Sequence, residues 1–497
     1  MSLSIIYTRA RRGIDAPLIT VEVHLSNGLP GLSIVGMPET VVKESKDRVR
    51  SALINSQFEF PARRITINLA PADLPKDGSR FDLPIAIGIL AASGQVPADH
   101  LEQFEFIGEL ALSGELRDVE AILPVAIACH HSNRQLLTST NNAVEAARYE
   151  QCESYGAPSL LDICLHLHGT QLLNKAVAPP IIETSYPLDF ADVKGQPFAK
   201  RALEITAAGG HNLLMYGSPG TGKTMLASRL PGIMPPLNSP QSIEVASIHS
   251  LCGHTYTPWT TPPFRHPHHS SSAVSLVGGG SQPKPGEISL AHNGILFLDE
   301  IPEFPRHVLE VLREPMESGE INISRASAQV CFPAAFTLIA ALNPCPCGYF
   351  GSSSSKHHCR CSPDQIRRYR QKISGPLLDR IDLHVPVAHT TISDLQKLPN
   401  GESSNKIKQR VIKAREKQIM RQGNNNAQLT KIQLNTHCQL TKSDRIFLDN
   451  AVDALGLSAR AYDRILKTAR TIADLKNEDD INKKDISEAI SFRNFDR

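Results

Sequence analysis

The sequence predicts an α/β protein with an N-terminal α/β segment, a second α/β segment and a helical C-terminal segment. Three observations lead to this prediction. Short β-type runs alternate with helical patterns over residues 1–175 and again over residues 189–389. Near residue 220, an apolar run enters a glycine-rich loop that a helical pattern follows. Mostly helical patterns continue over residues 390–497.

Length and composition narrow the class of protein. The chain has 497 residues, enough for two or three domains, and its 41% hydrophobic and 21% charged residues are typical of a soluble globular protein. The formal net charge of +2 gives no sign of nucleic-acid binding, so any such surface has to be a local patch. No apolar run is long enough for a membrane span, and the apolar residues of MSLSIIYTRARRGID precede the basic ones, the reverse of a secretory signal. We therefore expect a cytoplasmic protein with no membrane partner, whose cysteines are thiols or metal ligands.

The first segment, residues 1–175, contains the β-type runs LITVEVHL, GLSIVGM and RITINLA. Helical patterns lie between them, as in ETVVKESKDRVRSALINS and RFDLPIAIGILAASG. Residues 176–188 include two consecutive prolines and are typical of a linker. This linker separates the first segment from residues 189–389.

The second segment carries the clearest motif of the chain. The apolar run NLLMY leads into GSPGTGKT, which matches G-x-x-x-x-G-K-[ST] in the strand–loop–helix order of a P-loop. Such a loop turns its N–H groups toward phosphate oxygens, while its lysine reaches the β- and γ-phosphates and its threonine binds Mg²⁺. The alternative is a tight structural turn. The motif predicts an ATP and Mg²⁺ site at Gly217, Ser218, Pro219, Gly220, Thr221, Gly222, Lys223 and Thr224.

Two later apolar runs are expected to add polar side chains to this site. ILFL, typical of a buried parallel strand, is followed by Asp299 and Glu300. Asp299 is expected to hold Mg²⁺ together with Thr224, and Glu300 to polarise the attacking water. A further run ends at Asn343, which could position that water. Alone, an acidic pair at a strand end or an Asn-Pro turn would be weak evidence, but their order after a P-loop favours catalytic roles.

Two arginines complete the expected catalytic set. Arg380, in SGPLLDRIDLHVPV, precedes an apolar strand, at a corner that faces the neighbouring subunit in ring ATPases. An arginine supplied in this way stabilises transition-state charge. Arg460 begins a helix of the C-terminal segment and could close that segment onto the phosphates of its own subunit. Surface or salt-bridge arginines are the alternative in both cases.

Four cysteines between residues 345 and 361 have a spacing that suits a metal. Two CxC pairs, separated by a stretch rich in glycine and serine, can form a tetrahedral Cys₄ site. His357 and His358 are possible substitutes for one ligand, and four free thiols are the alternative. We expect a structural zinc ion that shapes a basic loop, bound by Cys345, Cys347, Cys359 and Cys361.

Several long motifs together resemble one family. GSPGTGKT, PFRHPHHSSSAVSLVGGG, PGEISLAHNGILFLDEIPEF, NPCPCGYFG and GPLLDRIDLHV are similar to the motifs of magnesium-chelatase-like AAA+ ATPases, as is GLPGLSIVGMPETVVKESKDRVRSAL. The resemblance covers nearly the whole chain and implies an AAA+ α/β core at 189–389 with a helical lid at 390–497. It also implies a homohexameric helicase or translocase that promotes branch migration on single-stranded and branched DNA, in natural transformation and homologous recombination.

Residues 1–175 resemble the Lon-protease-like fold, which is also that of ribosomal S5 domain 2. LPKDGSRFDLPIAI parallels the loop of the serine nucleophile, but Arg80 occupies the position of that serine, with Ser79 adjacent. The catalytic lysine would fall near Leu123, where no lysine is found. Since a nucleophilic serine needs a base within hydrogen-bond reach, we expect a domain without a catalytic dyad that serves assembly or DNA contact.

Two insertions interrupt the ATPase core. They are PFRHPHHSSSAVSLVGGGSQPKPGE and SGEINISRASAQVCFP, and the second alternates like a hairpin. The resemblance places both in a central pore, where Lys284 and Arg325 would contact DNA phosphates; solvated surface loops are the alternative. The first insertion's histidines, His266, His268 and His269, are expected to pack or hydrogen-bond rather than bind metal. The basic stretch 406–421 is either a solvated helix face or a DNA contact.

These motifs are compatible with two ATP-driven functions, a DNA motor and a chelatase-type motor that remodels a protein partner. Both need the same ATP site, so that site cannot separate them. The cysteine pairs and the basic insertions favour DNA. A third possibility, a nucleotide-gated scaffold, is disfavoured because the catalytic set is intact.

Overall fold

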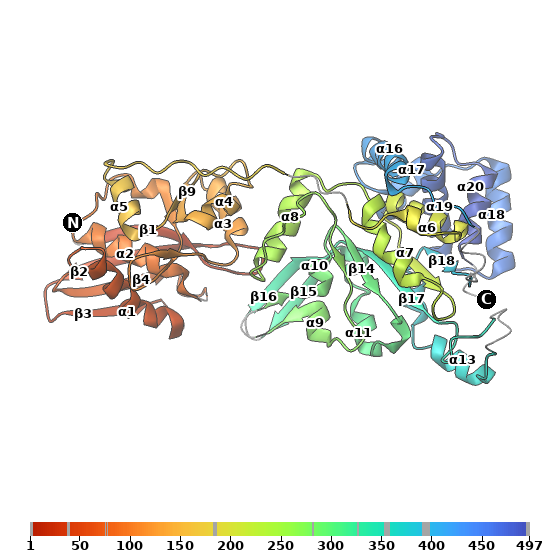
Figure 1. The fold of residues 1–497 in the computed structure, drawn as a ribbon, viewed down its shortest axis with the longest axis horizontal. Coiled ribbons are helices and arrows are strands. Elements are labelled where there is room, and N and C mark those ends of the chain that lie inside the picture. Colours follow the sequence, from red (N-terminus) through yellow and green to blue (C-terminus); the bar gives the residue numbers. More distant parts are fainter. Residues whose placement is uncertain are drawn as a thin grey trace. The chain divides into compact units, whose positions relative to one another are not determined.

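The computed structural model describes residues 3–36, 40–74, 76, 78–181, 186–280, 283–325, 328–351, 358–389 and 398–493. The chain divides into two units: unit 1 comprises residues 1–182 and 242–259, and unit 2 comprises residues 183–241 and 260–497. Figure 1 labels many of the helices and strands of both. Among the described residues, no helix is both long and apolar enough to cross a lipid bilayer.

Unit 1 is built on a seven-stranded sheet with the strand order β3-β4-β2-β1-β5-β8-β9. β2 lies antiparallel to β1 and β4, and the other neighbours are parallel. The strands are β1 (Leu3–Arg9), β2 (Leu18–Ser26), β3 (Gly31–Val35), β4 (Arg64–Ala70), β5 (Phe104–Phe106), β8 (Gln135–Ser139) and β9 (Ser154–Ala157). A separate two-stranded sheet pairs β6 (Glu109–Leu110) with β7 (Leu116–Arg117). The three β-type runs predicted from the sequence are therefore confirmed.

The helices of unit 1 cover this sheet because their apolar residues need burial. α2 (Asp82–Ala92) is apolar on every side and buried along its whole length, as expected of a helix inside a core. It packs on β1, β2 and α1 (Thr40–Asn55). The remaining helices of residues 1–182 are α3 (Ile122–His131), α4 (Thr140–Ala146) and α5 (Leu160–Leu167).

Unit 1 also contains a segment that was expected within the ATPase core. Residues 242–259, which comprise most of α8 (Ser239–Ser250) and the loop to Trp259, group with residues 1–182. Ala121 donates a backbone hydrogen bond to the carbonyl oxygen of Ser250 (3.1 Å), and the Arg148 guanidinium lies 4.8 Å from the Trp259 ring centroid. The structural boundary therefore differs from the predicted one, because residues 242–259 find their buried partners in the first segment.

Unit 2 has a five-stranded, all-parallel sheet in the order β11-β14-β17-β10-β18. Its strands are β10 (Leu213–Tyr216), β11 (Phe264–Arg265), β14 (Ile295–Leu298), β17 (Thr337–Leu342) and β18 (Leu383–Pro386). β14 and β17 are buried at every residue, so their apolar runs are continuous rather than alternating. Since all five strands run in one direction, their carboxyl ends meet at one edge of the sheet.

α6 (Pro197–Gly209) and α7 (Lys223–Arg229) share one core with this sheet and with the C-terminal helices. The other helices described between residues 260 and 389 are α9 (Ala273–Val277), α10 (Glu287–Leu290), α11 (Arg306–Val311), α12 (Pro315–Ser318), α13 (Pro363–Arg370) and α14 (Gly375–Leu378). The C-terminal helices, grouped together in Figure 1, are α16 (Ser404–Gln422), α17 (Lys431–His437), α18 (Lys442–Leu455), α19 (Ala459–Leu475) and α20 (Lys483–Ser491).

Several cations of the basic stretch 406–421 make bonds within unit 2. Arg415 donates to the carbonyl oxygens of Ala207 and Ala208 on α6, at 3.0 and 2.9 Å. Arg421 pairs with the buried Asp474 of α19 at 2.7 Å. Arg410 and Lys417 form salt bridges as well, with Glu204, Glu402 and Asp479. These four side chains therefore fasten α16 to its neighbours, a role that the sequence did not reveal.

Candidate functional site

The P-loop follows β10 and ends at the start of α7. Gly220 and Gly222 have φ angles of 76° and 89°, in the left-handed region that favours glycine. At Gly217, a Cβ atom would lie 2.4 Å from the carbonyl oxygen of Val387, so this position admits only glycine without a shift of the backbone. These constraints explain the glycines of GSPGTGKT. The resulting curled loop, ahead of a helix N-terminus, fits a chain of phosphates.

Lys223 is the buried cation of this loop. Its Nζ donates to the carbonyl oxygens of Gly217 (2.7 Å) and Ser218 (3.1 Å) and to Asn343 Oδ1 (3.2 Å). Burial lowers the pKa of Lys223, and the nearby carboxylates of Asp299 and Glu300 partly offset that effect. The amine is thus held at the P-loop, where it can meet phosphate oxygens.

Thr224 and Asp299 meet across the edge of the sheet. The Thr224 hydroxyl donates to Asp299 Oδ2 at 2.7 Å, although 75 residues separate the two in the sequence. A hydroxyl and a carboxylate oxygen are hard ligands of the kind that Mg²⁺ takes in nucleotide sites. The pair therefore fits the predicted Mg²⁺ position.

Glu300 occupies a left-handed backbone conformation, with φ of 51°. Its backbone N–H donates to Asp299 Oδ1 at 2.9 Å, which fixes the turn, and its side chain is exposed. His269 Nδ1 lies 3.7 Å from Glu300 Oε2. The histidine run was expected to pack or hydrogen-bond, and the sequence gives no sign of its contact with Glu300.

The other histidines of this run pack locally. The His266 ring lies 4.7 Å from the ring of Phe297 on β14, and His268 Nδ1 is 2.8 Å from the hydroxyl of Ser270. The run follows β11, the strand next to β14, and this neighbouring position brings His269 to the acidic pair. The contact between His269 and Glu300 depends on the order of strands in the sheet, which cannot be predicted from a single sequence.

The two predicted catalytic arginines lie in different environments. Arg380 is buried, forms an ion pair with Glu317, and donates to the carbonyl oxygen of Pro376 at 2.7 Å. Arg460 is exposed in the first turn of α19. One turn further along α19, Arg464 pairs with the buried Asp382, so the helix that carries Arg460 is anchored beside β18.

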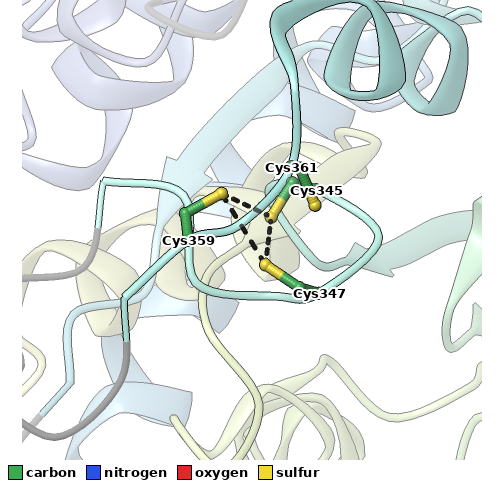
Figure 2. A group of neighbouring side chains, drawn as sticks. All are labelled: Cys345, Cys347, Cys359 and Cys361. Atoms are coloured by element: carbon green, nitrogen blue, oxygen red, sulfur yellow. Dashed lines mark hydrogen bonds between the residues drawn. The ribbon is translucent and has the colours of Figure 1, made fainter.

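The four cysteines converge, as Figure 2 shows. Cys345 Sγ lies 3.3 Å from Cys347 Sγ and 3.7 Å from Cys359 Sγ, and Cys347 and Cys359 are also 3.7 Å apart. All four sulfur atoms lie within 4.8 Å of one another. Sulfurs around a tetrahedral zinc ion with Zn–S bonds of about 2.3 Å are about 3.8 Å apart. The geometry and the all-thiol donor set therefore fit zinc.

Backbone N–H groups support this cluster. Phe350 N–H donates to Cys345 Sγ at 3.3 Å. Hydrogen bonds from the backbone of Tyr349 and Arg360 lower the pKa of the Cys347 thiol to about 6. Such bonds favour the thiolate, which is the form that binds a metal. Of the histidines suggested as substitutes, His358 is exposed and His357 lies outside the described residues.

The two predicted DNA contacts lie on short hairpins. Lys284 is exposed on β13 (Lys284–Pro285), which pairs with β12 (Gly278–Gly279). Arg325 ends β15 (Glu320–Arg325), which pairs with β16 (Ala328–Pro333), so the predicted hairpin is confirmed. The side chain of Arg325 lies outside the described residues.

In unit 1, the residues around the protease-like loop have structural partners. The Ser79 hydroxyl donates to Glu109, and Lys76 Nζ donates to the carbonyl oxygen of Pro71. Arg80 is buried and donates to the carbonyl oxygen of Glu120 at 2.8 Å, just ahead of α3. Arg80 thus holds the segment that contains Leu123, where a protease would carry its lysine.

Comparisons with known proteins agree with this arrangement. Three family profiles match the chain: "Subunit ChlI of Mg-chelatase" over residues 21–142, "Magnesium chelatase, subunit ChlI" over 189–395, and "Magnesium chelatase, subunit ChlI C-terminal" over 401–493. Competence protein ComM of Haemophilus influenzae is 52% identical, covering 99% of this chain and 98% of its own length. Uncharacterized protein YifB of Salmonella typhimurium is 50% identical, covering 100% and 98%. The magnesium-chelatase 38 kDa subunit of Cereibacter sphaeroides is 25% identical, covering 32% and 53%. The chain therefore belongs to the magnesium-chelatase-like family of AAA+ proteins.

Proposed function

We propose that this chain hydrolyses ATP and uses the energy to move DNA. The observation that carries the ATPase part is the convergence, at one edge of the parallel sheet, of a P-loop amine, a threonine hydroxyl and the carboxylates of two strand-end acids. Lys223 would hold the phosphates, Thr224 and Asp299 would hold Mg²⁺, and the ion would neutralise charge on the phosphates when bound.

The residues beyond the phosphates supply the remaining roles. Glu300 would take up or orient the proton of the attacking water, with Asn343 beside Lys223 at the end of β17. Arg460 would contact phosphates of the same subunit, and Arg380 those of a neighbour in a homohexamer. The Cys₄ cluster would hold a structural zinc ion that fixes the loop between β17 and α13.

The DNA part is supported by the two hairpins and by one relative. Lys284 and Arg325 lie on hairpins that interrupt the ATPase core, and cations on such projections can bind backbone phosphates. The relative that is 52% identical is named a competence protein, which supports a role in natural transformation and recombination, including branch migration. The partial match to a magnesium-chelatase subunit supports a second candidate, a motor that remodels a protein partner.

One experiment separates these candidates. The ATPase rate is measured alone and with single-stranded, duplex and forked DNA, together with unwinding of branched DNA. A DNA motor is stimulated by at least one of these DNAs, whereas a protein-remodelling motor is indifferent to all of them. The double variant Lys284→Ala/Arg325→Ala should lose the stimulation. Unchanged DNA affinity and unwinding in that variant would favour the protein-remodelling candidate.

A further inference from the structure

A cation-lined cleft lies beside the acidic pair of the ATP site. It has a volume of about 440 Å³ and is walled on one side by the loop after Glu300 and on the other by the end of α13. This volume is within the range of ligand sites in proteins. Its lining residues include the exposed cations Arg306, Arg368 and Lys372 and one carboxylate, that of Glu303.

The charges of this cleft are only partly compensated. Lys372 Nζ lies 3.4 Å from Glu303 Oε2, and the two side chains are 47% and 43% exposed. Exposed pairs of this kind contribute about 0–1 kcal/mol, so an incoming anion can displace Glu303. Within the described part of the chain, neither Arg306 nor Arg368 makes a salt bridge, and Arg306 has only a weaker electrostatic interaction with Glu310 on α11, whose pKa it helps to lower. The cleft therefore keeps an excess of positive charge.

Stabilisation of a helix end explains only some of these cations. Cations in the last turn of a helix interact favourably with its C-terminal carbonyls. On α13, Arg367 is tied to Asp364 at 2.6 Å, and Arg370 lies over the Phe350 ring, 5.5 Å from its centroid. Arg306 comes from the opposite wall, at the start of α11, so the α13 helix end does not account for its place in the cleft.

Both walls are connected to parts of the proposed machinery. α13 begins two residues after Cys361 and is fixed by a capping box between Ser362 and Gln365 and by the buried Tyr369. The opposite wall continues the turn Ile301–Glu303, which starts at Glu300. The cysteine cluster thus supports the cation-bearing wall, and the catalytic glutamate begins the other.

We propose that this cleft binds the phosphodiester backbone of nucleic acid, and that binding there acts on Glu300 through the turn Ile301–Glu303. Guanidinium groups match phosphate oxygens in a bidentate way, and two of them face this cleft from different elements. A phosphate that takes Lys372 from Glu303 removes a restraint on the turn beside Glu300. The proposal rests on the proposed DNA function and names a place where DNA meets the ATPase core.

The test uses variants whose effects have opposite signs. Arg306→Ala/Arg368→Ala should weaken binding to two unrelated DNA sequences equally and lower the salt slope by roughly 1–2 units. Glu303→Gln should strengthen binding, because it removes a repulsive charge and frees Lys372. A matched control, Lys442→Ala/Arg445→Ala, removes two exposed cations from α18 and should leave both quantities unchanged. Binding of full-length protein to labelled oligonucleotides is measured across a salt series, without ATP.

The outcomes separate this proposal from the proposed function. Unchanged DNA affinity in Arg306→Ala/Arg368→Ala, with a wild-type protein that binds DNA, overturns the cleft alone. A wild-type protein that binds no DNA overturns both. A double variant that binds DNA normally but fails to assemble would assign the cleft to a contact with a second copy of the chain, and so would also overturn the proposal. Thermal unfolding of each variant checks that it is folded.

Discussion

Arg380 and Glu317 form an ion pair within one chain, and the two side chains differ greatly in exposure. The arginine side chain is 8% exposed and that of the glutamate is 59% exposed. Glu317 belongs to α12, just ahead of the β15–β16 hairpin, and Arg380 follows α14, just ahead of β18. An arginine that acts on a neighbouring subunit therefore has to leave Glu317 first, and the hairpin begins next to that contact.

Loss of the arginine should affect the neighbouring subunit. We expect Arg380→Ala protein to assemble but to hydrolyse ATP about 10³-fold more slowly, if the residue contributes as an arginine finger does in GTPases. Mixing it with Lys223→Ala subunits should restore some activity, because each variant supplies the part that the other lacks. ATPase assays of the separate and mixed proteins check this, and normal turnover by Arg380→Ala would assign the residue a purely structural role.

Removing the charge of Glu317 should raise the rate of ATP hydrolysis. Glu317→Gln keeps the size of the side chain but removes the charge that holds Arg380, so we expect faster ATP hydrolysis by the oligomer. Glu314→Gln is the matched control, because Glu314 immediately precedes α12 but contacts Asn322 instead, at 3.3 Å. Equal rates for both variants would show that the Arg380–Glu317 pair does not restrain hydrolysis.

The two key residues of the ATP site should fail in different ways. Lys223→Ala removes the buried cation that meets phosphates, so nucleotide binding should weaken. Glu300→Gln should still bind ATP but hydrolyse it about 10²–10⁴-fold more slowly, because the side chain no longer accepts a proton. Fluorescent-nucleotide titration and turnover assays distinguish the two defects. Wild-type turnover by Glu300→Gln would refute the role given to that residue.

The cysteine cluster should hold one zinc ion per chain. Structural zinc contributes on the order of 10–16 kcal/mol of apparent binding free energy in small peptides, so its removal should destabilise unit 2. Elemental analysis and thermal unfolding with and without a chelator measure this. Cys359→Ser should lose metal, whereas Cys331→Ser, an exposed cysteine outside the cluster, should keep it. Metal-free protein with four freely titratable thiols would contradict the prediction.

Acid should destabilise unit 2 partly through His384. Burial, followed by the neighbouring Arg493, lowers the pKa of this histidine to about 3, whereas an unfolded histidine titrates near 6.5. Between these values the unfolded chain binds the extra proton, so stability falls as pH falls, by up to about 1.4 kcal/mol per pH unit. This contribution is fully present above about pH 6.5.

Urea unfolding at several pH values measures the effect. His384→Gln should flatten the dependence between pH 6 and 4, within the range set by the two pKa values. The exposed His389 provides the control, because its replacement by Gln should leave the dependence as in wild type. Identical pH profiles for the His384 variant and the wild type would show that other groups cause the acid sensitivity.

The sequence could predict that Lys223, Asp299 and Asn343 lie close together, because their proximity follows from local rules. A P-loop has a fixed spacing, and buried parallel strands place their last residues at a common edge. The Cys₄ cluster was also accessible, because its ligands lie close together in the sequence. These features depend on short segments, whose positions follow from motif spacing and from the common edge at which parallel strands end.

The remaining features depend on contacts between distant segments. Arg380 was expected at a subunit boundary, but the sequence around it does not indicate that it forms an ion pair with Glu317. The cations of α16 were expected to form a solvated or DNA-binding face, whereas Arg415 donates hydrogen bonds to carbonyl oxygens of α6. His269 reaches Glu300 only because β11 lies next to β14. Strand order and helix packing decide such pairings, and a single sequence does not specify either.

The assignment of residues 242–259 to unit 1 has a consequence for dissecting the protein. Val245, Ile248, Leu251 and Trp259 are buried in the intact chain. A truncation that removes residues 1–182 would take from this segment its partners within unit 1, among them Arg148 beside the Trp259 ring, and newly exposed apolar surface favours aggregation. Proteolytic cleavage between residues 182 and 186 would instead leave a nicked protein, whose two fragments stay joined through α8 and the loop that follows it. Unit 1 is therefore better studied by point substitution than by deletion.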